Sequence, residues 1–230
     1  MLELRAVDIR QDDFRLRADL AVATGRKVAV IGPSGAGKST LLSTIAGFFR
    51  QTSGQVVWQG RPLDGVAPGK RPISMLFQDG NLFPHLDIAR NIGLGIAPSL
   101  RLSEQDRARV EDALQRVGLG GMGGRTPAAL SGGQQSRAAL ARILVQNRPL
   151  LLLDEPFAAL GPALRAEMLD LVSDLVDETG VTLLMVSHDP ADARRIAQDI
   201  MLVDDGHAYP PAEAGQMLAD PPEALRRYLG

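Results

Sequence analysis

The sequence predicts an α/β fold with a parallel core, an antiparallel β subdomain and an α-helical insertion. Three observations support this prediction. A glycine-rich loop stands between a short apolar run at 27–31 and a helical stretch at 39–46. Two further apolar runs, at 150–153 and 181–187, end at polar residues, as buried parallel strands do. The segment 14–22, like 2–9 before it, alternates apolar and polar residues, which indicates half-exposed strands.

The loop at 32–40 reads GPSGAGKST and fits the pattern G-x-x-x-x-G-K-[ST] at every position. Its glycines let successive backbone N–H groups turn inward, and the following helix adds its positive end. Lys38 can reach the β- and γ-phosphates, and the Ser39 hydroxyl can ligate Mg²⁺. We therefore predict a P-loop NTPase core that binds a nucleoside triphosphate. The predicted binding residues are Gly32, Pro33, Ser34, Gly35, Ala36, Gly37, Lys38, Ser39 and Thr40.

Composition narrows the class of protein. The 230 residues suffice for one well-buried domain, and 25 basic against 27 acidic residues give a net charge of −2, so we expect no nucleic acid as the main partner. The absence of cysteine excludes disulfides, zinc–thiolate clusters and thiol catalysis. No apolar run approaches the ~20 residues of a membrane span, so any role at a membrane needs another chain.

Two aromatic or polar residues border the predicted nucleotide site. Phe14 opens an alternating strand, and its ring suits either an adenine face or the core; both interpretations stay open. Gln78 ends the apolar run at 73–77, and strand ends beside a crevice are where α/β proteins place ligand contacts. A strand at 55–60 precedes it along the chain.

The segment after Gln78 turns from loop to helix and carries Leu82, Phe83 and Leu86 beside a proline. Apolar residues exposed beside helix breakers suggest a docking surface. His85 within this loop is interpreted as solvated rather than as a ligand. A serine-capped helix at 103–117 belongs to the helical insertion, and the glycine run at 120–124 predicts a flexible connector.

A second helix start with anion-binding character follows at Leu-Ser-Gly-Gly-Gln, residues 130–134, ahead of a helix at 135–146. Ser131 is placed as an N-cap, and the two glycines leave the first N–H groups of the helix uncovered. A purely structural cap would need only the serine. The candidate ligand-binding residues are Ser131, Gly132, Gly133 and Gln134.

Acidic residues mark the end of the apolar run at 150–153. Asp154 and Glu155 should point to different sides, so that one supports Mg²⁺ while the other orients and deprotonates water. An amphipathic helix is expected at 162–178. His188 ends the run at 181–187 and suits donation to a γ-phosphate oxygen or, alternatively, a helix-cap role.

These motifs together resemble, in order and spacing, the ATPase subunit of an ABC transporter over residues 1–210, with a helical insertion at about 79–148 and a short tail at 211–230. The resemblance implies ATP and Mg²⁺ as ligands. It implies that Glu155 is the general base and that His188 contacts the γ-phosphate. It further implies that Gln78 senses Mg²⁺ and water, with metal contacts from Ser39, Gln78 and Asp154.

The resemblance also implies partners. Residues 131–134 would meet ATP bound by the opposite subunit, giving a homodimer with ATP at its interface. An integral membrane permease would receive the dimer at the cytoplasmic face of the inner membrane, where the ATPase is peripheral. A periplasmic solute-binding protein would act indirectly, through the permease.

The segments 71–78, 81–83, 85–86 and 91–95 resemble bacterial thiamine importer ATPases more narrowly, so we expect import of a small solute, first thiamine or its phosphates. Relatives that import iron, sulfate or polyamines share parts of these segments. A non-transport ABC ATPase of DNA repair or translation would need a coiled-coil or zinc insertion or a second cassette. A nucleotide-gated assembly module is conceivable because Gly161 replaces the acid that usually ends Ser-Ala-Leu-Asp.

Overall fold

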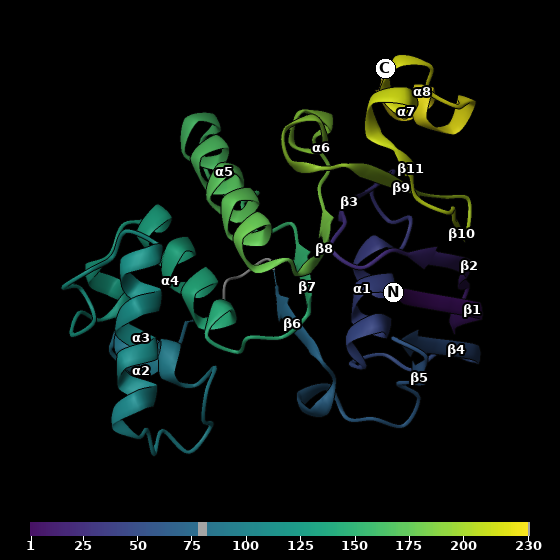
Figure 1. Cartoon of the computed structure of the whole chain (residues 1–230). Helices are drawn as coiled ribbons and strands as arrows, with labels where there is room; N and C mark the ends of the chain where they lie inside the picture. The colour runs from purple at the N-terminus through teal and green to yellow at the C-terminus, as the bar shows by residue number, and fades with distance from the viewer. Residues whose placement is uncertain (78–81, 230) are drawn as a thin grey trace.

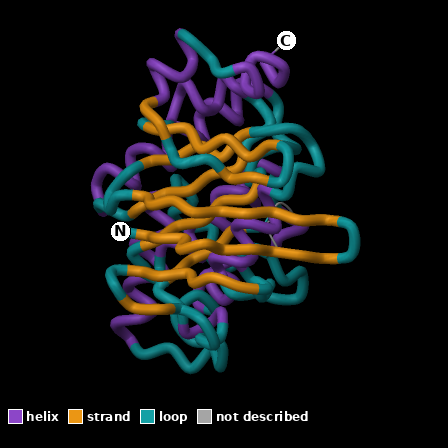
Figure 2. The backbone as a smooth tube through the Cα atoms, turned by 90° about the vertical axis from the view of Figure 1, so that its right-hand side faces the viewer, coloured by secondary structure: helices purple, strands orange, loops and turns teal. Residues whose placement is uncertain are grey.

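A computed structural model describes residues 1–77 and 82–229 of the chain (Figure 1). Gln78, one of the predicted site residues, lies outside the described residues. Within them, eleven strands form one curled, mixed sheet in the order β5-β4-β1-β2-β10-β9-β3-β8-β7-β6, with β11 paired to β9. Figure 2 shows these strands lying one beside the next through the middle of the molecule. The strands are β1 (Leu2–Gln11), β2 (Phe14–Val22), β3 (Lys27–Ile31), β4 (Ser53–Trp58), β5 (Arg61–Pro62), β6 (Ile73–Leu76), β7 (Leu150–Asp154), β8 (Thr182–Val186), β9 (Asp199–Asp204), β10 (His207–Ala208) and β11 (Ala212–Glu213).

Helices connect these strands and cover the sheet. They are α1 (Lys38–Ala46), α2 (Ile88–Gly93), α3 (Glu104–Arg116), α4 (Gly132–Leu144), α5 (Pro162–Thr179), α6 (Pro190–Ile196), α7 (Ala214–Ala219) and α8 (Glu223–Leu229), with 3₁₀ turns at Pro68–Lys70 and Pro127–Ala129. In the described part of the chain, no helix combines the length and the apolarity needed to cross a membrane.

The parallel half of the sheet, β9-β3-β8-β7-β6, is buried on both faces, which explains its nearly continuous aliphatic sequence. Leu150 and Leu152 of β7 join the core cluster around α1, whereas Leu151 and Leu153 join the cluster around α5. Successive side chains of a strand alternate between its faces, so one aliphatic run fills two cores. Because both faces of these strands are packed with aliphatic side chains, the polar site residues lie at the ends of the strands.

The antiparallel half is formed by β1, β2, β4 and β5, and the burial of β2 alternates residue by residue, as its sequence predicts. Its buried residues share the cluster around α1 with the parallel strands. A register shift between Leu4 and Val7 accompanies a positive φ of 47° at Ala6. Such a bulge increases the local twist, which suits the curl of the sheet around α1.

The helices α2, α3 and α4 form a separate unit, the helical lobe, beside the sheet (Figure 1). Its core includes Ile88, Ile92, Leu114 and Val117, all fully buried. Capping boxes at Ser103 with Asp106 and at Ser131 with Gln134 start α3 and α4. Because α4 also packs against β6, the lobe is anchored next to the parallel strands.

Arg71 offers a test of how the loop before β6 is fixed. Its side chain is 5% exposed, and its guanidinium donates to the carbonyl oxygens of Thr44, Ile45 and Val66 at 2.7–3.1 Å. Burial lowers its pKa. We expect Arg71→Met to reduce the free energy of unfolding by about 2–3 kcal/mol, since the Ile45 carbonyl would lose its partner, whereas the Thr44 carbonyl keeps the Gly47 N–H.

Urea denaturation of the full chain measures this change. The matched control is Arg61→Met on the exposed edge strand β5, where we expect a change within about 0.5 kcal/mol. Equal effects at both positions would contradict the role assigned to Arg71.

Candidate nucleotide-binding and catalytic site

The glycine-rich loop runs from the end of β3 into α1, as predicted. Gly32 has a φ of 150°, and a β-carbon there would lie 1.9 Å from the Val203 carbonyl oxygen in β9. Gly35 and Gly37 have φ values of 80° and 98°, in the left-handed region that glycine tolerates. Nothing lies within 4 Å of a β-carbon placed on Gly35, so this side of the loop is open to a ligand.

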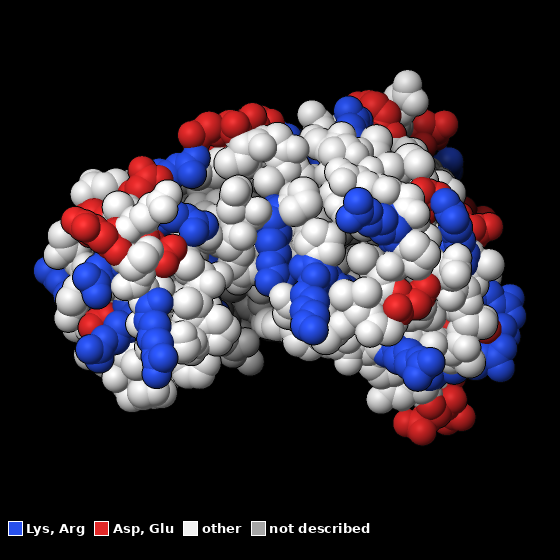
Figure 3. Space-filling view, turned by 60° about the horizontal axis from the view of Figure 1, so that its bottom comes forward, with Lys and Arg blue, Asp and Glu red and all other residues white. Residues whose placement is uncertain are grey.

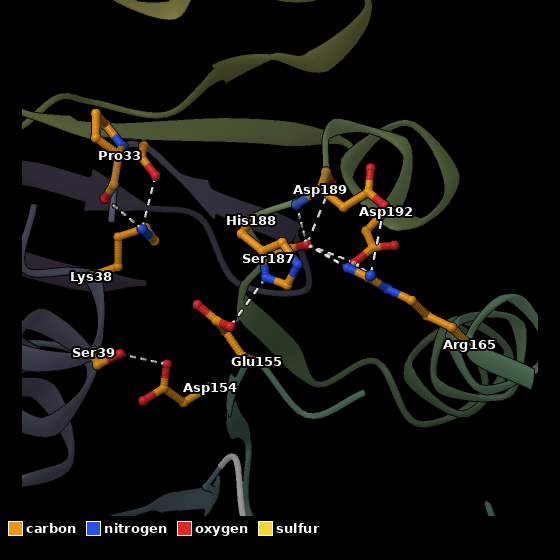
Figure 4. A network of polar contacts seen from close by, with 11 residues as sticks. Pro33, Lys38, Ser39, Asp154, Glu155, Arg165, Ser187, His188, Asp189 and Asp192 are labelled. Carbon is orange, nitrogen blue, oxygen red and sulfur yellow. Dashed lines mark hydrogen bonds and ion pairs between the residues drawn. The ribbon is translucent and has the colours of Figure 1, made fainter. Parts of the chain in front are cut away.

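Lys38 lies at the start of α1 and is 6% exposed. Its Nζ donates to the carbonyl oxygens of Gly32 and Pro33, both at 2.8 Å (Figure 4). Burial lowers the pKa of this ammonium, while the nearby charges of Glu155 and Asp154 act to raise it. The ammonium is therefore held against the backbone of the glycine-rich loop.

Asp154 ends β7 and points toward the start of α1 (Figure 4). Its Oδ1 accepts a hydrogen bond of 2.8 Å from the Ser39 hydroxyl, across 115 residues of sequence. Burial raises the pKa of this carboxyl, and the Ser39 hydrogen bond opposes that shift. A hydroxyl and a carboxylate at hydrogen-bond distance form an oxygen donor set of the kind that Mg²⁺ prefers.

Glu155 turns the other way, toward β8. Its Oε2 lies 3.1 Å from Nδ1 of His188, and the two side chains are 25% and 51% exposed. The backbone of Glu155 has a φ of 44°, which costs a non-glycine residue about 1–3 kcal/mol. Adjacent carboxylates on the two sides of one strand end are thus directed to two different partners, as expected.

The turn that holds His188 is fixed by residues that the sequence analysis did not single out. Ser187 is 2% exposed, and its hydroxyl donates to Asp192 Oδ2 at 2.6 Å. Asp192 also accepts from Arg165 Nε at 3.0 Å (Figure 4). Arg165 and Asp192 stand 27 residues apart on two different helices, so no local spacing reveals the pair.

The segment 131–134 lies in the helical lobe, at the start of α4. The Ser131 hydroxyl accepts from Gln134 N at 3.3 Å, and Gln134 Oε1 accepts from Ser131 N at 3.0 Å. Gly133 is buried, and a β-carbon there would lie 2.4 Å from Leu164 at the start of α5. Gly132 faces open space. The serine therefore caps the helix, and ligand binding by residues 131–134 stays a prediction, for which Ser131 and Gly132 are accessible.

Phe14 is half-buried, and its ring packs against Gly37 of the glycine-rich loop. It also contacts the core cluster around α1. Gly161 is the N-cap of α5, with φ −64° and ψ 157°, and nothing lies within 4 Å of a β-carbon placed there. Neither backbone strain nor lack of space requires glycine at this position.

The predicted docking loop is only partly apolar at its surface. Phe83 is 46% exposed, with its ring 6.0 Å from that of the exposed His85. Leu82, in contrast, packs against the cores of the helical lobe and of α5, and Leu86 is half-buried. Fully buried Asn91 fixes the loop by accepting from Phe83 N at 2.7 Å and donating to three of its carbonyls at 3.0–3.1 Å.

The β3–loop–α1 unit beside the carboxylates of β7 defines a P-loop nucleoside triphosphatase. The ABC transporter family profile matches residues 16–158. The thiamine import ATP-binding proteins ThiQ of Cereibacter sphaeroides and Ruegeria sp. are 60% and 61% identical to this chain over 230 residues, all of both chains. The chain belongs to the ABC transporter family, as an ATPase subunit, which confirms the predicted resemblance.

Solved structures agree on the fold. A dimeric bacterial ABC transporter cassette and a dimeric ATP-binding cassette in a post-hydrolysis state, bound to ADP and phosphate, each have a TM-score of 0.80. Each is 29% identical to this chain, and the match covers 93% of this chain and 99% of the other. The predicted fold class is therefore confirmed, and nucleotide binding belongs to the family.

The placement of Glu155 predicts the effect of removing its charge. Glu155→Gln should still bind ATP, because the glycine-rich loop is untouched, but should hydrolyse it at least roughly a hundredfold more slowly, the usual scale for losing a general base. Calorimetry gives the affinity, and phosphate release gives the turnover. Unchanged turnover would exclude Glu155 as the base.

The raised pKa of Asp154 predicts a pH-dependent stability. Because the pKa in the folded chain exceeds that in the unfolded chain, ionising this carboxyl weakens the fold as pH rises through the folded value. Asp154→Asn should therefore increase the free energy of unfolding at pH 7, without nucleotide or Mg²⁺. The gain should fade as the pH approaches the ordinary aspartate pKa of about 4.

Urea denaturation at both pH values measures the difference, and Asp13→Asn on the exposed turn before β2 is the matched control. A loss of stability in Asp154→Asn at pH 7 would show that the carboxylate stabilises the fold instead.

Proposed function

We propose that this chain is the ATP-hydrolysing subunit of a thiamine importer, and that it works as a homodimer with ATP and Mg²⁺ at the interface. The observation that carries the proposal is the match, over the whole of both chains, to thiamine import ATP-binding proteins at 60% identity. The glycine-rich loop beside Lys38 and the two carboxylates at the end of β7 support the proposal.

Residues of the glycine-rich loop would hold the phosphates of ATP. Lys38 would exchange its bonds to the Gly32 and Pro33 carbonyls for bonds to phosphate oxygens, and charge-assisted bonds of this kind are the strong ones. Ser39 and Asp154 would hold Mg²⁺, together with Gln78. When bound, the metal neutralises the charge of the transferring phosphoryl group.

Glu155 would accept the proton of the attacking water as its oxygen bonds to the γ-phosphorus and the bond to ADP breaks. His188, with Nδ1 beside the Glu155 carboxylate, would donate to a γ-phosphate oxygen. Glu155 is half-buried, and its charge acts to raise the pKa of Lys38. The carboxylate is therefore close enough to the nucleotide loop to act on a group bound there.

The second subunit would complete each site. Ser131 and Gly132 are exposed at the start of α4, in the helical lobe and away from α1 (Figure 1). Uncovered N–H groups at a helix start attract phosphate. A partner chain in head-to-tail orientation would bring its residues 131–134 onto the ATP held by residues 32–40. The solved cassettes of similar fold are dimers, which supports a dimer here.

A separate integral membrane permease would carry the solute, and the ATPase would attach to it at the cytoplasmic face of the inner membrane. A periplasmic solute-binding protein would deliver the solute to that permease. Figure 3 shows that one face of the molecule is hollowed between the helical lobe and the rest, a shape that can receive a segment of another chain.

The function is tested by purifying the full chain with the membrane protein that accompanies it and reconstituting both in vesicles. We expect ATP-dependent uptake of labelled thiamine, and loss of uptake with Lys38→Ala. Labelled iron, sulfate and spermidine test the related importers in parallel. Uptake of one of these solutes, with none of thiamine, would overturn the thiamine assignment but leave the ATPase in place.

The exposed Phe83 is the residue at which we expect the ATPase to contact the permease. Phe83→Asp should leave ATP affinity within about twofold, while thiamine uptake falls about tenfold or more, because a charge would enter an apolar contact. Tyr209→Asp is the matched control, since Tyr209 is similarly exposed, at 43%, and follows β10 on the opposite side of the molecule (Figure 1). Normal uptake by Phe83→Asp would exclude this loop as the docking surface.

A further inference from the structure

The Ser187 hydroxyl is the centre of a buried hydrogen-bond network next to His188 (Figure 4). It donates to Asp192 Oδ2 at 2.6 Å and accepts from Asp189 N at 3.0 Å and from Arg165 Nη2 at 3.3 Å. With one donated and two accepted bonds, the hydroxyl uses its full capacity. Its position is therefore fixed by two segments, α5 and the start of α6.

Asp192 carries the charge of this network. Asp192 is 7% exposed, and its Oδ2 accepts hydrogen bonds from both Nε and Nη2 of Arg165. The side chain of Arg165 is 15% exposed. Arg165 also lies 3.6 Å from Asp189. Breaking such a buried pair leaves an uncompensated charge, so the pair holds α5 and the start of α6 in one arrangement.

His188 stands between the two residues that this network holds. The backbone on its N-terminal side is fixed through Ser187, whose N–H donates to the Val30 carbonyl at 3.3 Å, and the backbone on its C-terminal side through Asp189 N. The side chain of Asp189 caps α6 by accepting from Ala191 N at 2.9 Å. The imidazole is half-exposed and meets Glu155 at 3.1 Å, so its direction depends on this turn.

Arg165 also reaches the segment that departs from the family pattern. Its backbone N–H donates to the Gly161 carbonyl at 2.9 Å, within the first turn of α5. This is the main-chain bond of an ordinary helix start, so Arg165 lies one turn after Gly161, and its side chain reaches from there to the turn that carries His188.

We propose that Arg165 is a positioning residue for hydrolysis: with Asp192 and Ser187 it sets the His188 ring beside Glu155, and it links the start of α5 to that ring. The inference rests on the roles proposed above for Glu155 and His188. It assigns Arg165 no contact with ATP.

The chain contains a matched control for the ion pair. Arg195 of α6 bonds to Asp170 of α5 at 2.6 Å, so this pair also joins the two helices, but it is more exposed and none of its described bonds involves the His188 turn. Arg195→Met therefore removes an α5–α6 ion pair without disturbing Ser187.

The test measures kcat for ATP hydrolysis and the ATP dissociation constant in full-length Arg165→Met, Ser187→Ala and Arg195→Met. Each is made both alone and in a His188→Ala background. We expect Arg165→Met and Ser187→Ala to lower kcat at least about tenfold while ATP affinity stays within about twofold. With His188→Ala present, either change should lower kcat by less than about twofold, because both act through one side chain.

Equal losses with and without His188 would overturn the proposal, as would an effect of Arg195→Met as large as that of Arg165→Met. If Arg165→Met does not fold, Ser187→Ala decides, with Ser187→Thr expected to restore activity because it keeps the hydroxyl. If His188→Ala leaves kcat unchanged, the role of His188 in the proposed function fails, and the inference fails with it.

Discussion

The register of three parallel strands determines where the chemistry of this protein lies. Val30 of β3 pairs with Val186 of β8, and Val186 pairs with Asp154 of β7. The next residues along the three strands lead to the glycine-rich loop, to Ser187 and to Glu155. A shift of one residue in β7 would turn Asp154 to the opposite face and away from Ser39. Aliphatic residues that fill both cores prevent that shift, so packing far from the site maintains its geometry.

The sequence was sufficient for those parts of the site that depend on a single strand or turn. The apolar run before Asp154 predicted a buried strand, and the glycines of residues 32–40 predicted a turn with left-handed backbone. Because parallel strands end at a shared edge of the sheet, Ser39 was expected near Asp154. Pairs between helices were harder, because Arg165 resembles any polar residue of an amphipathic helix until α6 is placed beside it. Leu82 followed the same rule: a loop leucine looked exposed, but two cores cover it.

The separation of the two predicted anion-binding elements means that, in the proposed dimer, each subunit would supply only part of each nucleotide site. Lys38 belongs to the sheet and its helix α1, whereas Ser131 belongs to the helical lobe (Figure 1). Gly133 packs against Leu164 at the start of α5, next to the turn that contains Arg165. The helical lobe therefore contacts α5 beside the residues that hold His188. This contact connects the start of α4 to the His188 turn through only a few side chains.

The electrostatics of the site couple ligand binding to folding. Burial raises the pKa of Asp154 and lowers that of Lys38, so both charged forms are disfavoured in the folded chain by loss of water. A phosphate near Lys38 and a divalent cation near Asp154 would each restore an opposite charge. The ligand would then stabilise the folded chain by RT ln(1 + [L]/Kd). Part of that gain would come from Lys38 and Asp154, whose charges lose water on folding. The burial that disfavours both charges in the isolated subunit would thus favour an anion bound at Lys38 and a cation bound at Asp154.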